Sequence, residues 1–231
     1  MKKNLSKGGF TLIELISSIA VFTIVTGVIL YNYSQFNSNV LITNYAYDVA
    51  LTIRQAQVFG VAVHVRQGSN LNGSAGDFGE SYGVHFSSLP PNNSFIFFAD
   101  LNIPGHTPNI YDADAATPAN DESLEIHSLP GSYVFKNFCV VAKGASAYQC
   151  SDAAAAAGIT PIQFLDISFT RPEPDAHIKT NDPASTSAEI YRQATICLQS
   201  PLGKRRQVVV ESTGQIWTTT SPLAGSSCDQ Q

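Results

Sequence analysis

Apolar residues divide the chain into an unbroken apolar segment, an amphipathic segment and a remainder of short runs. From Phe10 to Leu30 nearly every residue is apolar or small, and Glu14 is the only charged one. An α-helix rises about 1.5 Å per residue, so this segment is about 30 Å long, which matches the hydrocarbon core of a bilayer. The pattern therefore predicts a membrane-spanning helix.

The helix is predicted to continue to about Gly60, because no proline interrupts this part of the chain. In its second half, apolar residues recur at steps of three and four residues, which places them on one helix face. They are Ile42, Ala46, Val49, Ile53 and Ala56. Polar residues such as Asp48 and Gln57 fall off this stripe. We expect the second half of the helix to pack against a sheet.

After Gly60 the pattern changes to short runs rich in β-branched and aromatic residues, separated by loops rich in Pro, Gly, Asn and Asp. A long N-terminal helix followed by such runs indicates an α+β fold, with the helix packed on an antiparallel β-sheet. No linker or internal repeat is evident, so the remainder is expected to form one domain. Strands are predicted at residues 61–66, 81–86, 94–99, 123–128, 133–142, 162–170, 194–199 and 206–218.

The start of the chain carries a recognisable motif. Gly9-Phe10-Thr11-Leu12-Ile13-Glu14 resembles the cleavage and methylation signature of type IV pilins and type II secretion pseudopilins, and Lys2, Lys3 and Lys7 resemble its basic leader. The resemblance implies cleavage after Gly9 and N-methylation of Phe10. It also implies that Glu14 of one subunit neutralises the Phe10 amine of a neighbour and so sets the register of assembly. Such pairing makes physical sense because each charge alone is costly in lipid.

This interpretation divides the chain into a leader (1–9), a helix (10–60, of which 10–30 spans the membrane) and an extracytoplasmic β-rich head (61–231). The leader lysines favour a cytoplasmic N-terminus by the positive-inside rule, so we expect a single-pass protein of the inner (cytoplasmic) membrane that enters a pilus or pseudopilus. The alternative is a plain signal peptide or signal anchor. A signal peptide would carry a small-x-small cleavage site after its apolar region, and Ser17-Ser18 is a poor candidate for one.

Two further segments narrow the resemblance. Residues 51–57 followed by 61–65, and residues 196–198 followed by 205–216 with Gly214 at a turn, are similar to the helix end and closing hairpin of H-type minor pseudopilins and FimT-like pilins. Many major pilins carry a proline in the apolar segment, and this chain does not. The resemblance implies prepilin peptidase, other pilin or pseudopilin subunits, an inner-membrane assembly platform and membrane lipid as partners. It leaves the system open: secretion, adhesion, motility or DNA uptake.

Four cysteines lie on the side predicted to be extracytoplasmic, where an even count suggests disulfides. Short loops close most readily, which favours pairing Cys139 with Cys150 and Cys197 with Cys228. Three connectivities are open in principle. No two of these cysteines have the C-x-x-C spacing of a zinc site.

Charge and motifs restrict the remaining chemistry. The formal net charge is −5, and loss of the three leader lysines makes it more negative, so nucleic-acid binding is not expected. Lys204-Arg205-Arg206 is the one basic cluster. In a DNA-uptake pilin such a patch could contact phosphate, but the simpler interpretation is a charged turn between strands. The five histidines are scattered singly and predicted to be structural or exposed. No nucleophile elbow, HExxH or P-loop motif occurs, so the chain is not expected to be an enzyme.

An acidic segment between Asp100 and Glu125 has the oxygen ligands that Ca²⁺ prefers, although it lacks EF-hand spacing. Asp112, Asp114 and Asp121 are the candidate ligands if the segment holds a cation. The simpler interpretation is a solvated acidic loop without a cofactor.

Overall fold

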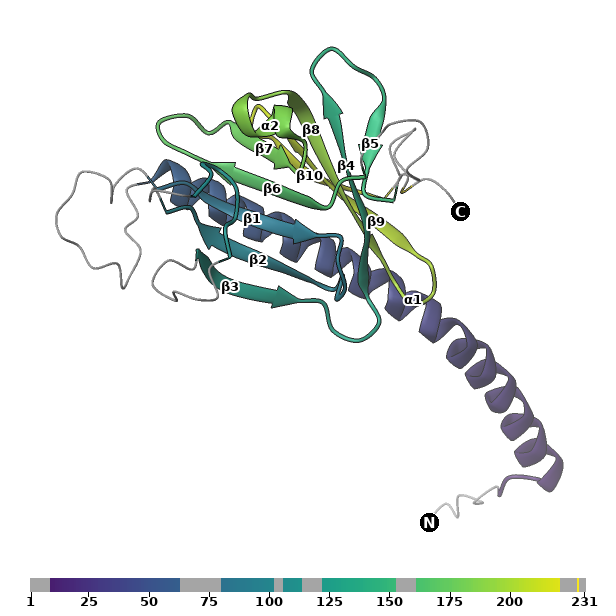
Figure 1. Ribbon diagram of the computed structural model, residues 1–231. Coiled ribbons are helices and arrows are strands. Elements are labelled where there is room, and N and C mark those ends of the chain that lie inside the picture. The colour runs from purple at the N-terminus through teal and green to yellow at the C-terminus, as the bar shows by residue number, and fades with distance from the viewer. Residues whose placement is uncertain are drawn as a thin grey trace, which may run out of the picture.

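A 50-residue helix is the longest element of the computed structural model, which describes residues 9–62, 80–101, 106–113, 122–152, 161–220 and 228. Helix α1 runs without a break from Leu12 to Val61. Its first half projects away from the rest of the molecule, and its second half lies along the β-rich head (Figure 1). The predicted α+β fold is confirmed.

The head contains two antiparallel five-stranded sheets where the sequence predicted one. Sheet A has the order β3-β2-β1-β6-β7, and sheet B has the order β10-β9-β8-β4-β5. The strands of sheet A are β1 (Tyr82–Ser87), β2 (Ser94–Ala99), β3 (Ser123–Ser128), β6 (Phe164–Phe169) and β7 (Ala176–Thr180). Those of sheet B are β4 (Val134–Ala142), β5 (Tyr148–Cys150), β8 (Tyr191–Gln199), β9 (Arg205–Glu211) and β10 (Ile216–Thr219).

Most predicted strands are present, with differences at their ends. The strands predicted at 94–99 and 123–128 have those bounds, and the run predicted at 206–218 is a hairpin of β9 and β10. Its turn contains Gly214 with φ +82°, a conformation that glycine adopts at no steric cost. The strand predicted at 61–66 is wrong at its first residue, because Val61 ends α1; residues 63–66 lie outside the described residues. Strands β5 and β7 and the short helix α2 (Pro183–Ser187) were not predicted.

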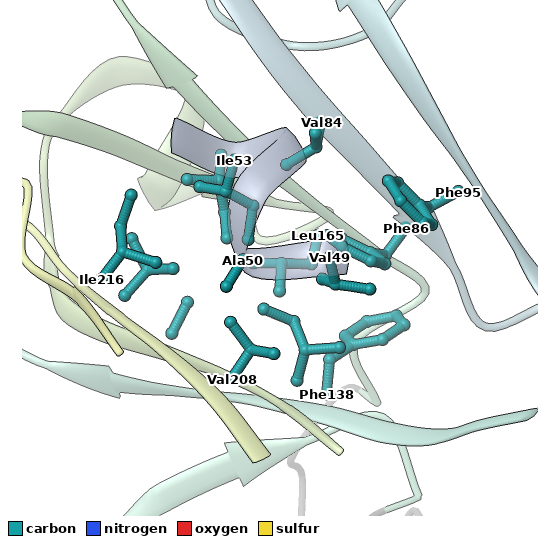
Figure 2. Close-up of a cluster of buried hydrophobic side chains, with 14 of the residues drawn as sticks. Val49, Ala50, Ile53, Val84, Phe86, Phe95, Phe138, Leu165, Val208 and Ile216 are labelled. Atoms are coloured by element: carbon teal, nitrogen blue, oxygen red, sulfur yellow. The ribbon is translucent and has the colours of Figure 1, made fainter. Parts of the chain in front are cut away.

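The predicted helical stripe forms the centre of the core. All five of its residues are at most 1% exposed, and α1 contacts β1 and β6 of sheet A as well as β8, β9 and β10 of sheet B. Figure 2 shows Ala50 and Ile53 of α1 among side chains of both sheets, including Leu165, Val208 and Ile216. One helix face therefore closes the apolar sides of both sheets at once.

Polar contacts fix the helix along sheet B. Arg206 Nε donates to Thr43 Oγ1 at 3.0 Å, and Arg54 Nη2 donates to the Ile216 carbonyl at 3.0 Å. One turn further on, Gln57 Nε2 donates to the Gly214 carbonyl at 3.0 Å. These contacts place the start of β9 beside the middle of α1 and the end of β9 beside its C-terminal turns.

A glycine permits the closest approach between helix and sheet. A Cβ added to Gly60 would lie 2.2 Å from the backbone oxygen of Phe169 at the end of β6, a distance that real Cβ atoms do not adopt. Phe59 packs next to this point, with its ring edge-on to those of Tyr82 and Phe97. The C-terminal end of α1 is thus held tightly against sheet A.

Candidate functional site

The N-terminal motif forms the first turn of α1. Thr11 is the N-cap, and its Oγ1 accepts a hydrogen bond from Glu14 N at 3.3 Å. A threonine at the cap with a glutamate three residues later has the spacing of a capping box, so Thr11 has a structural role that the sequence analysis did not assign. Gly9 and Phe10 precede the helix and are exposed, as is the side chain of Glu14. The three residues of the predicted cleavage, methylation and assembly site are therefore accessible at one end of the helix.

The apolar half of α1 is not covered by the head. Its large side chains from Phe10 to Leu30 are between 51% and 83% exposed, and α1 is long and apolar enough to cross a membrane. Exposed aromatic residues follow at once, at Tyr31, Tyr33 and Phe36. Such residues commonly mark the level of lipid headgroups.

A second apolar stripe runs along the outer face of α1 beyond the predicted membrane span. Five large apolar residues between positions 36 and 58 are 41–69% exposed in the described structure. At 3.6 residues per turn they lie within about 60° of arc, about 150° from the centre of the core stripe. They are Phe36, Val40, Tyr47, Leu51 and Val58, and we call them the outer stripe.

The acidic segment is folded around buried carboxylates. Glu122 is 0% exposed; its Oε1 accepts from Leu101 N at 2.9 Å, and its Oε2 accepts from Asp112 N at 2.7 Å. Asp100 Oδ2 accepts from Asn109 N at 2.7 Å, and Asp166 Oδ2 accepts from Tyr111 N at 3.2 Å. These carboxylates thus accept the backbone N–H groups of residues 106–113 that a neighbouring strand would otherwise accept. In this way they hold the segment over one end of sheet A.

Burial of these carboxyl groups changes their acidity. Loss of solvent raises the pKa of Asp100, Glu122 and Asp166 above the ordinary values. Hydrogen bonds from backbone N–H groups lower each pKa in part. Neighbouring carboxylates raise it further: the charge of Asp112 raises the pKa of Asp100 and Asp166, and the charge of Asp100 raises that of Glu122. We call Asp100, Glu122 and Asp166 the buried carboxylates.

The predicted calcium ligands are only partly brought together. Asp112 lies with His106 and Glu122, and one ligand atom from each falls within 4.8 Å of the others. Asp114 and Asp121 lie outside the described residues. An imidazole beside two carboxylates suits a transition-metal ion better than Ca²⁺. Asp112 and Glu122 oxygens already accept backbone N–H groups, which is a sufficient structural role for both, and calcium binding stays a prediction.

Histidines pair with carboxylates in a way that single positions in the sequence did not indicate. His85 Nδ1 lies 2.6 Å from Asp166 Oδ1, and these residues are register partners on β1 and β6. His106 Nδ1 lies 3.0 Å from Glu122 Oε1, and His177 Nδ1 lies 3.0 Å from Glu189 Oε1. These contacts agree with the structural or exposed roles expected of the histidines, in the case of His85, His106 and His177. His64 lies outside the described residues.

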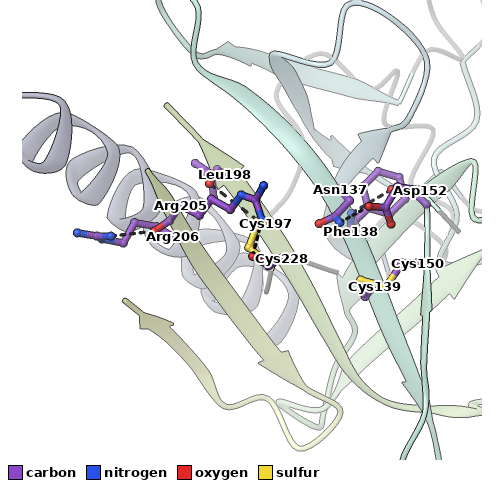
Figure 3. The surroundings of a disulfide bond; sticks show 11 residues. Asn137, Phe138, Cys139, Cys150, Asp152, Cys197, Leu198, Arg205, Arg206 and Cys228 are labelled. Carbon is purple, nitrogen blue, oxygen red and sulfur yellow. Dashed lines mark hydrogen bonds between the residues drawn. A yellow bond between two sulfur atoms is a disulfide. The ribbon is translucent and has the colours of Figure 1, made fainter. Parts of the chain in front are cut away.

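Both disulfides join cysteines that are close in the chain. Cys139 bonds to Cys150, its register partner across β4 and β5, and Cys197 of β8 bonds to Cys228 (Figure 3). This is the local pairing that loop length favours. Arg205 Nη1 donates to the Cys228 carbonyl at 3.0 Å. Two residues of the basic cluster are therefore engaged in contacts within the protein: Arg205 with Cys228, and Arg206 with Thr43 of the helix.

The comparison with known families points to the N-terminal segment. Residues 4–30 match the family model described as the prokaryotic N-terminal methylation motif. No curated protein and no solved structure is significantly similar to the chain. Together with the exposed apolar helix, the match supports a type IV pilin-like or pseudopilin-like protein. This class is structural rather than enzymatic, and its motif implies processing by prepilin peptidase and assembly with other pilins.

Proposed function

We propose that the protein is a minor pilin or pseudopilin, a subunit of a type IV pilus or a type II secretion-like filament. It is cleaved after Gly9, methylated at Phe10 and inserted in the inner membrane with its head on the extracytoplasmic side. It then assembles through α1 with sister subunits on an inner-membrane platform. The H-type or FimT-like assignment belongs to this proposal, as does the minor role. The long segments rich in Gly, Ser, Asn and Pro in the sequence favour that role over dense stacking in a homopolymer.

The outer stripe is the observation that favours a polymer over a monomeric anchor. A signal-anchored binding module explains exposed apolar residues up to Leu30, because lipid covers them. It does not explain Tyr47, Leu51 and Val58, which lie about 25–40 Å further along the helix by its rise per residue and are more than half exposed. Because slightly more than half of each side chain remains to be buried, burial stabilises an assembly by about 1–2 kcal/mol each. Packing of α1 against other helices is a simple way to cover them.

Within that assembly, Glu14 is proposed to pair with the Phe10 amine of a neighbour. Glu14 lies in the first turn of α1, where the N-terminal end of the helix dipole also favours negative charge. A buried pair of opposite charges is tolerable in an apolar bundle, whereas either charge alone is costly. The pairing therefore selects a specific axial offset between adjacent helices.

Mass spectrometry of the membrane-extracted protein tests the processing step. The expected mature chain begins at Phe10 and carries one added methyl group. A chain that begins at Met1 would identify a plain signal anchor, and a cut beyond residue 18 would identify a secreted protein; either result refutes the proposal.

The matched test of assembly is Glu14→Ala. We expect normal cleavage, because the substitution lies beyond the cleaved bond, and a loss of incorporation into sheared filaments or cross-linked oligomers. Thr23→Ala, which changes a polar side chain of the same span, serves as the control and should assemble normally. Normal incorporation of Glu14→Ala would refute the pairing.

A further inference from the structure

The contacts of α1 show which end of the head faces the membrane. Arg206, at the start of β9, contacts Thr43, whereas Gly214, after β9, contacts Gln57. Strand β9 therefore runs in the same direction as α1, and the turn that precedes it points back toward the apolar half of the helix. In Figure 1 this turn, between β8 and β9, lies beside the point where α1 leaves the head.

Three turns meet at this end. The β1–β2 turn joins the β3–β4 turn through the Asn93 carbonyl, which accepts from Leu129 N at 2.7 Å. The β3–β4 turn leads into β4, whose first residue, Val134, is the register partner of Gln199 at the end of β8. We call residues 88–93, 129–136 and 199–206 the proximal rim.

The proximal rim has no acidic residue and four basic ones, in a chain whose formal net charge is −5. Arg205 and Arg206 are held by hydrogen bonds, while Lys136 and Lys204 are exposed. Leu89 is 68% exposed and Leu202 is 44% exposed on the same rim. Apolar side chains beside basic ones also occur on helices that lie at a membrane interface, and the rim has the same two kinds of residue.

Acidic residues gather at the opposite end of the head. One group is formed by the carboxylates of Asp100, Asp112 and Glu122, which lie around residues 106–113. A second group, Glu173 and Asp175, comes just before β7. The first residue of β7 pairs with Phe169, which lies beside Gly60 at the C-terminal end of α1. Other described acids lie nearer the rim. They are Asp48, exposed on α1 five residues beyond Thr43; Glu125 in β3, 3.6 Å from His127 Nε2; Asp152, whose carboxylate accepts from Asn137 Nδ2 at 2.8 Å; and Asp182, next to Asn181, which is joined through Gln163 to Ser88. The rim itself therefore carries only basic charge, whereas a group of acidic residues lies at the opposite end of the head.

The rim also lies at the correct height for lipid. Thr43 is about 20 Å beyond Leu30 along the helix, and Arg206 lies at the level of Thr43 because the two residues are hydrogen-bonded. Lys204 comes two residues before Arg206, so it lies about 7 Å closer to the level of Leu30. Each headgroup layer is about 5–7 Å thick, and the potential of anionic lipid extends roughly another 8 Å at physiological ionic strength. Lys204 and Leu202 fall within this range.

We propose that the proximal rim binds the headgroups of anionic phospholipids while the subunit is still anchored in the membrane. Lys204 contacts lipid phosphate, and Leu89 and Leu202 enter the interfacial layer. Lys136 is level with Arg206 by strand register, further from the bilayer, and adds to the positive potential of the rim. The proposal rests on the membrane anchoring in the proposed function, but it does not depend on filament assembly. It assigns the rim a role in holding the head against the bilayer before the subunit is taken up into a filament.

Amide hydrogen exchange of the full-length protein in lipid nanodiscs tests this surface. Discs of phosphatidylcholine alone are compared with discs that contain equal parts phosphatidylcholine and phosphatidylglycerol, at one protein per disc. We expect exchange in the proximal rim to be at least about twofold slower in the anionic discs and unchanged at the acidic end. The double variant Lys136→Glu/Lys204→Glu should abolish the difference, and Lys136→Gln/Lys204→Gln should reduce it.

The matched control is Lys143→Glu/Arg192→Glu, which makes the same charge change at two exposed residues at the other end of β4 and β8. It should retain the lipid-dependent protection. Equal exchange in both lipids, or equal effects of the two glutamate variants, would overturn the proposal. Protection that grows with the number of copies per disc, whatever the lipid, would identify the rim as a subunit interface and also overturn it.

Co-flotation with liposomes separates this proposal from the anchor itself. A wild-type chain that floats with phosphatidylcholine vesicles but shows no lipid-dependent protection would refute the rim and leave the anchor intact. A wild-type chain that does not float would refute both.

Discussion

The two faces of α1 make a sharp prediction, because Ile53 and Leu51 are two residues apart on the same helix and have opposite surroundings. Ile53 is 0% exposed and Leu51 is 60% exposed. Ile53→Ala removes three buried carbons at about 0.8 kcal/mol each, and the cavity that remains raises the cost to about 3–4 kcal/mol. Leu51→Ala removes exposed carbons and should change the free energy of unfolding by no more than about 0.5 kcal/mol.

The assay is denaturant unfolding of the full-length protein in detergent, followed through the fluorescence of Trp217. This is the one tryptophan of the chain, and it lies half-buried in β10, opposite Val209 of β9. The same two variants are then scored for incorporation into filaments, where we expect Leu51→Ala to be defective despite its normal stability. A stability difference below about 1 kcal/mol between the variants would refute the assignment of the inner face to the core. Normal assembly of Leu51→Ala would refute the role of that position in the outer stripe.

Three further changes test the packing, the disulfides and the acidic segment. Gly60→Ala should destabilise the head by about 1–3 kcal/mol, because the added Cβ meets the Phe169 backbone; an unchanged unfolding midpoint would contradict the close approach. Removal of the disulfide from Cys197 to Cys228 should cost about 4 kcal/mol, and removal of the shorter one about 3 kcal/mol, since a longer loop gains more entropy on unfolding; the reverse order in denaturation curves would contradict this account. The pKa values of the buried carboxylates are higher in the folded protein than in the unfolded chain. Their contribution to the free energy of unfolding is therefore fully present below the ordinary pKa of about 4 and is lost as pH rises through the raised values. Asp166→Asn should flatten this decline in unfolding free energy measured against pH, and an unaltered slope would show that Asp166 does not contribute.

Features that depend on neighbours in the chain could be predicted from the sequence. The core stripe of α1 repeats at three and four residues, and each of its positions is buried, because helix geometry alone decides which residues share a face. Strand β2 was predicted from the apolar run Phe95-Ile96-Phe97-Phe98 and its flanking turn residues. Strand β7 was missed because its polar residues, such as Lys179, are satisfied by a partner ten residues away, Glu189.

Features that depend on strand pairing could not be predicted in the same way. Sheet A brings β1 beside β6, so Asp166 meets His85 across 81 residues of chain. Period-two patterns indicate that each segment is a strand, but they do not state which strand lies next to it. For the same reason one sheet was predicted where there are two. The acidic segment was interpreted as solvated, although Asp100 and Glu122 are almost fully buried, because their partners are backbone N–H groups of a loop.

The continuity of α1 connects the head to the events in the membrane. Proline in an apolar segment would weaken the helix, because it removes a hydrogen bond and clashes with the preceding turn. By the resemblance to major pilins, many of which carry a proline in this segment, Tyr31 stands at the corresponding place, and α1 is unbroken from Leu12 to Val61. The contacts of Thr43, Arg54 and Gln57 with sheet B then fix the head on the helix. The height of the proximal rim above the bilayer is therefore set by the number of helical residues between Leu30 and Thr43, and extraction of α1 must lift the rim and the head as one body.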